Sequence, residues 1–155
     1  MLGCEAALRL QGIIEDAKAQ KGLAVIGHIN RAINFAIKSA RHGEWLAPLE
    51  AIDKEGDCKA YSIAKYFALR EAGISPDHLR LVVVVHPNHG QENHMVVATL
   101  WHDQWLILDN LTLALVPFTL SEYVPLLVLD ESGMRRYTTD DDVLTIGATR
   151  RGGLR

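Results

Sequence analysis

The sequence predicts an α+β protein in which helices come first and an antiparallel sheet follows. Residues 5–72 are rich in helix-forming Ala, Leu, Glu and Lys and carry apolar residues at helical spacing. Residues 79–129 instead carry β-branched and alternating runs of strand length. This order favours segregated layers over the alternation of a doubly wound sheet. The 155 residues suit one domain over 1–155, with a frayed tail at about 147–155.

The helical half divides at its glycines. Gly22 separates a first helix, 5–21, from a second, 23–40, whose apolar stripe includes Ile26, Ile29 and Ile33. A short connection follows, and a third helix is expected over 59–72. That helix is mildly apolar on most faces, which places it in the middle of the fold.

The second half is expected to form the sheet. Strands are predicted at 79–85, 94–101 and 104–109, with His102-Asp103 as a two-residue turn between the last two. Further strands are expected at 112–116, 124–129 and 143–146.

Composition limits the function classes. The net charge is -3, hydrophobic residues make up 48% and charged residues 23%, and no basic run suggests nucleic-acid binding. No apolar stretch is long enough for membrane insertion. The two cysteines do not make a disulfide framework. As written, the sequence favours a cytoplasmic protein; a signal peptide missing from this chain would place it in the periplasm.

Cys58 is the candidate nucleophile because it lies where a Gly-Asp-Cys turn enters a helix. The free backbone N–H groups and the positive end of the helix dipole favour a thiolate there. The same N–H groups can stabilise an oxyanion during acyl transfer. The other interpretation of a lone cysteine in this position is an inert, buried side chain.

His94 and Asp109 are the candidate base and orienting carboxylate. If His102-Asp103 is the turn, Val96 lies opposite Asp109, and His94 shares a strand face with Val96. Diagonal neighbours of this kind have Cβ atoms roughly 7–8 Å apart, close enough for a hydrogen bond between the side chains. A register shift of one residue would place them on opposite faces.

Five segments resemble the bacterial transglutaminase-like cysteine proteinases, the group that includes LapG-type proteases. Three carry the candidate site: Gly56-Asp57-Cys58-Lys59-Ala60-Tyr61-Ser62-Ile63-Ala64-Lys65-Tyr66, His94-Met95-Val96-Val97 and Leu108-Asp109-Asn110-Leu111. Two lie upstream: Asn30-Arg31-Ala32-Ile33-Asn34 and Trp45-Leu46-Ala47-Pro48-Leu49-Glu50. The likeness covers roughly 25–130. It implies a papain/transglutaminase-like fold, a Cys58–His94–Asp109 triad and hydrolysis of peptide bonds in a protein or peptide substrate.

The resemblance also implies a calcium site, because LapG-type members bind the ion with acidic residues beside the nucleophile. Here Asp57 is retained, but Lys59 and Ala60 replace the two acidic residues expected after Cys58. Calcium takes several oxygen ligands, and a lysine ammonium repels it. We therefore expect no cofactor and no metal; Asp57 alone would remain of a calcium site.

Several alternatives stay open at this point. The same three residues would serve transglutaminase-type transfer of the acyl group to an amine, or the chain would be a non-catalytic protein-binding module on the same scaffold. A zinc site among His86, His89, His94 and His102 is disfavoured because the spacing follows neither a helix face nor a zinc knuckle. The sequence makes no prediction of the oligomeric state, the cleavage motif or the second oxyanion donor.

Overall fold

A computed structural model of the chain describes residues 2–41, 43–88, 90 and 92–137. The helices are α1 (Leu2–Lys18), α2 (Leu23–Ala36), α3 (Pro48–Asp53) and α4 (Cys58–Glu71), and two 3₁₀ turns are η1 (Pro76–His78) and η2 (Phe118–Leu120). The strands are β1 (Leu79–Val85), β2 (Asn93–Trp101), β3 (Gln104–Leu108), β4 (Val116–Pro117), β5 (Val124–Asp130) and β6 (Gly133–Arg136).

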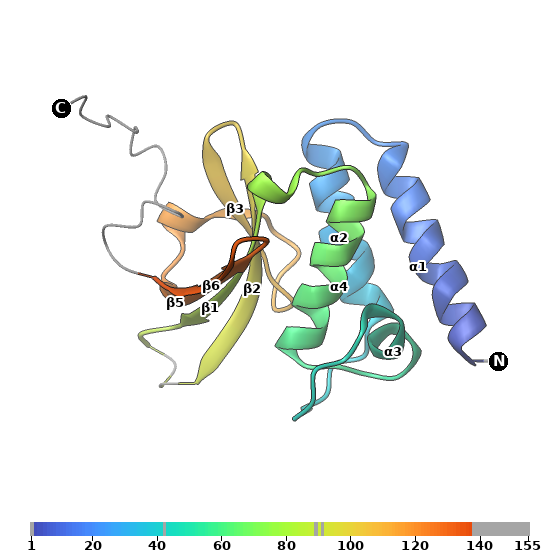
Figure 1. The fold of residues 1–155 in the computed structure, drawn as a ribbon, viewed down its shortest axis with the longest axis horizontal. Helices are drawn as coiled ribbons and strands as arrows, with labels where there is room; N and C mark the ends of the chain where they lie inside the picture. Colours follow the sequence, from blue (N-terminus) through green and yellow to red (C-terminus); the bar gives the residue numbers. More distant parts are fainter. Residues whose placement is uncertain (1, 42, 89, 91, 138–155) are drawn as a thin grey trace.

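The architecture is α+β, as predicted. The described strands form one antiparallel sheet in the order β4-β3-β2-β1-β5-β6. The four helices gather on one side of this sheet, with α4 in the layer nearest to it (Figure 1). No helix within the described ranges is long and apolar enough to cross a membrane.

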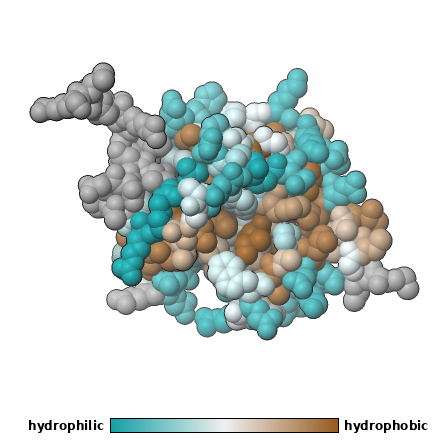
Figure 2. Space-filling view, viewed as in Figure 1, coloured by the Kyte–Doolittle hydropathy of each residue, from teal (hydrophilic) through white to brown (hydrophobic). Residues whose placement is uncertain are grey.

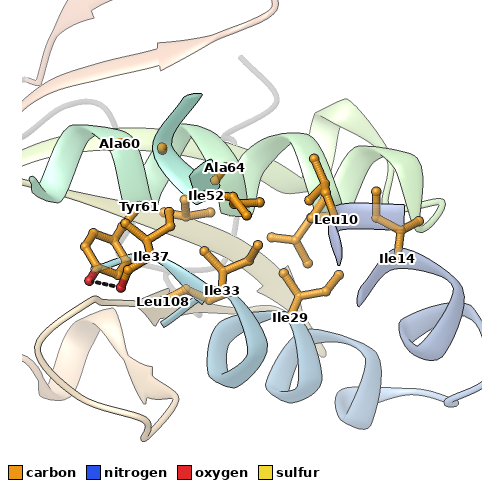
Figure 3. Packing of buried hydrophobic residues seen from close by; sticks show 14 of the residues in the cluster. Leu10, Ile14, Ile29, Ile33, Ile37, Ile52, Ala60, Tyr61, Ala64 and Leu108 are labelled. Atoms are coloured by element: carbon orange, nitrogen blue, oxygen red, sulfur yellow. Dashed lines mark hydrogen bonds between the residues drawn. The ribbon is translucent and has the colours of Figure 1, made fainter. Parts of the chain in front are cut away.

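Apolar side chains fill both sides of the central strands. One cluster joins the helices to the sheet through Leu79, Val97 and Leu108, and Figure 3 shows its helical members packed around α4. A second cluster on the other face contains Val96 and Ala98. Because neighbouring residues of β2 serve opposite clusters, its register is strongly specified.

The large helical cluster also contains a buried polar anchor. Tyr61 of α4 donates a hydrogen bond of 2.6 Å to the carbonyl of Ile37 (Figure 3). A buried hydroxyl without such a partner would be costly. The bond therefore ties α4 to the segment that follows α2.

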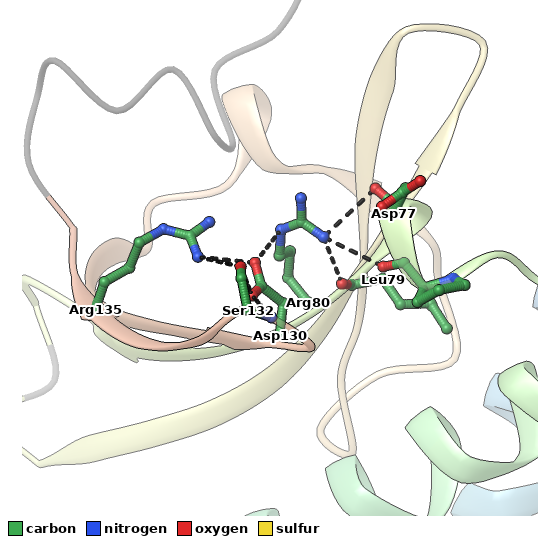
Figure 4. A network of polar contacts seen from close by, with 7 residues as sticks. Asp77, Leu79, Arg80, Asp130, Ser132 and Arg135 are labelled. Carbon is green, nitrogen blue, oxygen red and sulfur yellow. Dashed lines mark hydrogen bonds and ion pairs between the residues drawn. The ribbon is translucent and has the colours of Figure 1, made fainter.

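A polar network joins strands β1, β5 and β6. Asp130 of β5 lies 3.1 Å from Arg80 of β1 and 2.8 Å from Arg135 of β6, and Ser132 joins the same cluster (Figure 4). These contacts connect β1 to the β5–β6 hairpin. Elsewhere the surface shown in Figure 2 alternates between apolar and hydrophilic patches, as is ordinary for a folded domain.

Some boundaries were predicted wrongly. The second helix ends at Ala36 rather than residue 40, because Ile37 is extended and Ser39 forms a parallel bridge with Gly56. Helix α3 and strand β6 were not predicted. The strand expected at 112–116 was wrong: the pairing with β3 begins only at Val116. The strand expected at 143–146 and the tail at 147–155 lie outside the described residues.

Candidate active site

Cys58 is the first residue of α4, and the residues before it build that helix start. The side chain of Asp57 caps the helix by accepting hydrogen bonds from the backbone N–H groups of Lys59 at 3.0 Å and Ala60 at 3.4 Å. Gly56 passes so close that a Cβ atom on it would lie 2.4 Å from the Cβ of Ala60. In the Gly-Asp-Cys sequence, the glycine thus allows close packing, the aspartate caps the helix and the cysteine presents a partly exposed thiol.

The environment of Cys58 favours the thiolate. Burial raises the pKa of the thiol, but hydrogen bonds with His94 and with the backbone of Met95 lower it, and the resulting pKa is below the ordinary value of 9.0. Ser62 of the same helix donates to the Met95 carbonyl at 3.0 Å. This bond holds the first turns of α4 against the start of β2, where His94 lies.

The β2–β3 hairpin brings His94 to Asp109. Trp101 pairs with Gln104 and Val97 with Leu108, which is the register predicted from the turn. His94 Nε2 lies 2.8 Å from Asp109 Oδ1. The pKa of Asp109 is held below its ordinary value, so the carboxylate is ionised and can only accept; Nε2 must carry the proton. Nδ1 is then the ring nitrogen that remains for the sulfur.

The protonated form of His94 is stabilised by its neighbours. Burial lowers the pKa of the imidazole, but the hydrogen bonds with Asp109 and Cys58 outweigh burial and raise the pKa to about 9. A lowered thiol pKa and a raised imidazole pKa together favour a thiolate–imidazolium pair at neutral pH. The structure thus brings together the three side chains that the sequence singled out.

Asp109 is nearly sealed from solvent, with 3% of the residue exposed. Its pKa is raised by burial, yet hydrogen bonds from His94 and Tyr123 bring it below the ordinary value. Tyr123 donates to Oδ2 at 2.5 Å, and the N–H of Leu111 donates to Oδ1 at 3.1 Å. The side-chain amide of Asn34 donates to the Asp109 carbonyl at 2.9 Å. Sequence reasoning assigned Tyr123 no role, because no periodic pattern relates it to Asp109. Asn34 lies in a segment that resembles the family, but it was assigned no role either.

Lys65 is the other functional candidate missed by sequence reasoning. It lies in α4 with 1% of the residue exposed, and its Nζ has no hydrogen-bond partner among the described residues. Burial lowers its pKa to about 7, and the negative charge of Asp109 only partly opposes this effect. Lys65 belongs to the Gly56–Tyr66 segment that resembles the family, but the sequence alone indicates only an ordinary residue of a helix.

The residues beside Cys58 do not fit a calcium site. The Lys59 ammonium forms an ion pair with Asp57, whose other carboxylate oxygen accepts the helix N–H groups. Among the residues that the structure describes, no group of three or more His, Cys, Asp and Glu side chains could hold a metal ion. The Asp57 carboxylate is therefore already engaged by the Lys59 ammonium and by the backbone of the helix.

A cavity of about 260 Å³ lies beside Asp109. Its walls include Ile107, Leu111 and Val116, together with Tyr123 and His86. His86 Nε2 lies 3.0 Å from Glu122, and the His86 ring meets the edge of Tyr123 at 5.8 Å between centroids. His86 thus rims this cavity, while His89 lies outside the described residues.

Comparison with known proteins identifies the class. Residues 4–136 match the family described as bacterial transglutaminase-like cysteine proteinase BTLCP, so the chain belongs to this family of cysteine proteinases. The fold is similar to three structures of Legionella pneumophila LapG, each at 23% sequence identity.

The first LapG structure has a TM-score of 0.75 and covers 85% of this chain and 80% of its own. For the EGTA-treated form these values are 0.76, 88% and 80%, and for the calcium-bound form 0.69, 83% and 78%. A comparison with curated proteins finds no match.

Proposed function

We propose that this chain hydrolyses peptide or amide bonds through a thioester acyl-enzyme, with Cys58 as nucleophile, His94 as general acid and base and Asp109 as the orienting carboxylate. The observation that carries the proposal is the continuous hydrogen-bonded chain from Cys58 through His94 to the buried Asp109. Membership of the cysteine proteinase family supports it.

The first half of the reaction follows from the protonation states. The Cys58 thiolate attacks the substrate carbonyl, and the carbonyl oxygen becomes an oxyanion. The Cys58 N–H at the helix start serves as one oxyanion donor, because the Asp57 cap engages the N–H groups of Lys59 and Ala60 instead. The His94 imidazolium then gives its proton to the leaving amine, and a thioester with Cys58 remains.

The second half regenerates the enzyme. Neutral His94 takes a proton from a water molecule, which attacks the thioester carbonyl. The tetrahedral intermediate expels the Cys58 thiolate and releases the carboxylic acid, while His94 stays protonated. Throughout, ionised Asp109 accepts from Nε2, so the ring keeps Nδ1 toward the sulfur and the imidazolium is stabilised.

The test is labelling and turnover in matched cysteine variants. Separate samples are used: one is treated with a thiol-directed peptidyl electrophile to read labelling, and an untreated one is assayed on a peptide library by mass spectrometry to read cleavage. Cys58→Ala is expected to abolish labelling and cleavage, whereas Cys4→Ala, which removes the exposed cysteine of α1, retains both. Cleavage that persists in Cys58→Ala rejects the mechanism. A labelled primary amine in the same assay reveals amine transfer as the competing outcome.

We further propose that the activity does not require calcium, unlike what the calcium-bound LapG structure would suggest by analogy. The support is local: the Lys59 ammonium already neutralises Asp57 beside the nucleophile. EGTA is expected to leave the rate of Cys58 alkylation unchanged, and calorimetry is expected to detect no calcium binding. A rate that falls with EGTA and recovers with calcium would contradict this proposal.

A further inference from the structure

Tyr123 makes the shortest hydrogen bond to the buried carboxylate of the site. Its hydroxyl donates to Asp109 Oδ2 at 2.5 Å, on the opposite oxygen from the one that faces His94. The Tyr123 ring also lies against the His94 ring, with centroids 5.8 Å apart and planes inclined by 39°. One side chain therefore contacts two of the three residues of the proposed triad.

Asp109 needs this second donor for a physical reason. A carboxylate with 3% exposure loses its hydration, and each oxygen left without a donor favours the protonated acid. Oδ1 accepts from His94 and from the Leu111 N–H, whereas Oδ2 accepts from Tyr123. Without the hydroxyl, the carboxylate would be free to protonate or rotate, and its charge would act less on His94.

The hydroxyl is well suited to be a permanent donor. Burial and the hydrogen bond to Asp109 raise the pKa of Tyr123 above its ordinary value, so the phenol stays protonated. The chain holds the ring in place because Tyr123 directly precedes β5 and packs with the second hydrophobic cluster. The His86 ring contacts it from another side.

We propose that Tyr123 is a positioning residue that keeps Asp109 ionised and turned so that Oδ1 faces His94. This inference rests on the proposed peptidase function, in which His94 must be an imidazolium beside the Cys58 thiolate. The titratable groups around Asp109 are His94 from β2, Tyr123, Lys65 from α4 and, beyond the imidazole, Cys58. Of these, the Tyr123 hydroxyl can be removed without changing charge.

The experiment is a proton NMR titration of the His94 ring, which needs no substrate. In Tyr123→Phe, the weakened carboxylate holds the imidazolium less well, so the imidazolium loses its proton at lower pH. The midpoint, about 9 in the native chain, is expected to fall by about one pH unit. Replacing Tyr123 with 3-fluorotyrosine, whose hydroxyl is a stronger donor, is expected to move the midpoint to higher pH.

The matched control is Tyr61→Phe. It also removes a buried hydroxyl that donates a short hydrogen bond, here to the Ile37 carbonyl at 2.6 Å. It is expected to lower thermal stability without moving the His94 midpoint. A midpoint in Tyr123→Phe that coincides with the native one, or fluorotyrosine that leaves it unmoved, overturns the inference. Either result leaves the peptidase proposal to its own test with Cys58→Ala.

Discussion

Replacing Asp109 with Asn is the most direct test of the electrostatics at this site. The change keeps the shape of the side chain and removes its charge. Because the ionised carboxylate is the main opponent of burial at His94, the imidazolium should become less stable. The midpoint of the His94 titration is therefore expected to fall, and with it the upper limit of the pH range in which the ion pair exists.

The size of the effect follows from the pKa of His94. The rise from 6.5 to about 9 corresponds to roughly 3 kcal/mol at about 1.36 kcal/mol per pKa unit. Asp109 contributes more than Cys58 to the rise in the pKa of His94, and burial, which lowers this pKa, remains in the variant. We expect a midpoint between about 7 and 8, so at pH 8 the imidazolium fraction falls about two- to tenfold.

The assay is a proton NMR titration of the His94 ring in the native chain and in Asp109→Asn. Asp130→Asn is the control, because Asp130 is also shielded from solvent and ion-paired, but with Arg80 and Arg135 away from the site. Its His94 midpoint should stay at about 9. A midpoint near 9 in Asp109→Asn would refute the assignment of Asp109 as the source of this stabilisation.

The same pair makes a signed prediction for stability. The folded pKa of His94 is raised, so its contribution to stability is complete below pH 6.5 and is lost as pH rises through about 9. The loss of stability in Asp109→Asn should therefore be larger at pH 6 than at pH 10 in urea denaturation. An equal loss at both values would contradict the linkage.

Two further substitutions test the packing around the nucleophile helix. Lys65→Met should stabilise the fold by about 3–5 kcal/mol at pH 6 and by much less at pH 10. The reason is that the cost of burying a charged amine is complete below the folded pKa of Lys65, about 7, and fades as pH rises toward 10.5. Urea denaturation at both pH values measures this gain, and a gain independent of pH would count against the reasoning. Gly56→Ala should cost about 1–3 kcal/mol, because the new Cβ would meet Ala60 at 2.4 Å. Gly12→Ala, with nothing within 4 Å, is the control in thermal denaturation and should not destabilise.

The hairpin shows how much of the site sequence reasoning can reach. Counting from a two-residue turn at His102-Asp103 predicted that His94 and Asp109 meet, and the observed pairing of Trp101 with Gln104 confirms that register. Such counting works because strand geometry has a fixed period and the turn is local. The meeting of this hairpin with Cys58 was expected from the need of a nucleophilic thiolate for a base and from the family resemblance, not from any count.

Contacts that cross between distant segments were not accessible in the same way. Tyr123 lies beyond β4 and η2 from Asp109, and that connection has no periodic pattern from which a count could start. Lys65 was missed because a lysine in a helix is usually solvated, and only the packing of α4 against other elements buries it. Helix α3 was missed because six residues are too few for a periodic signal.

The turn at His102-Asp103 sets the strand register that brings His94 to Asp109 at the other end of the hairpin. His102 and Asp103 both have positive φ values, 45° and 62°, which is the backbone of the two-residue turn that matches the twist of paired strands. A slip of one residue there would move Asp109 to the opposite face from His94 and would send the buried side chains of β2 to the wrong clusters. The apolar pattern of β2 and β3 therefore selects the same register that the hydrogen bond between His94 and Asp109 requires. The buried charges of the site are held in place by the same packing that stabilises the fold.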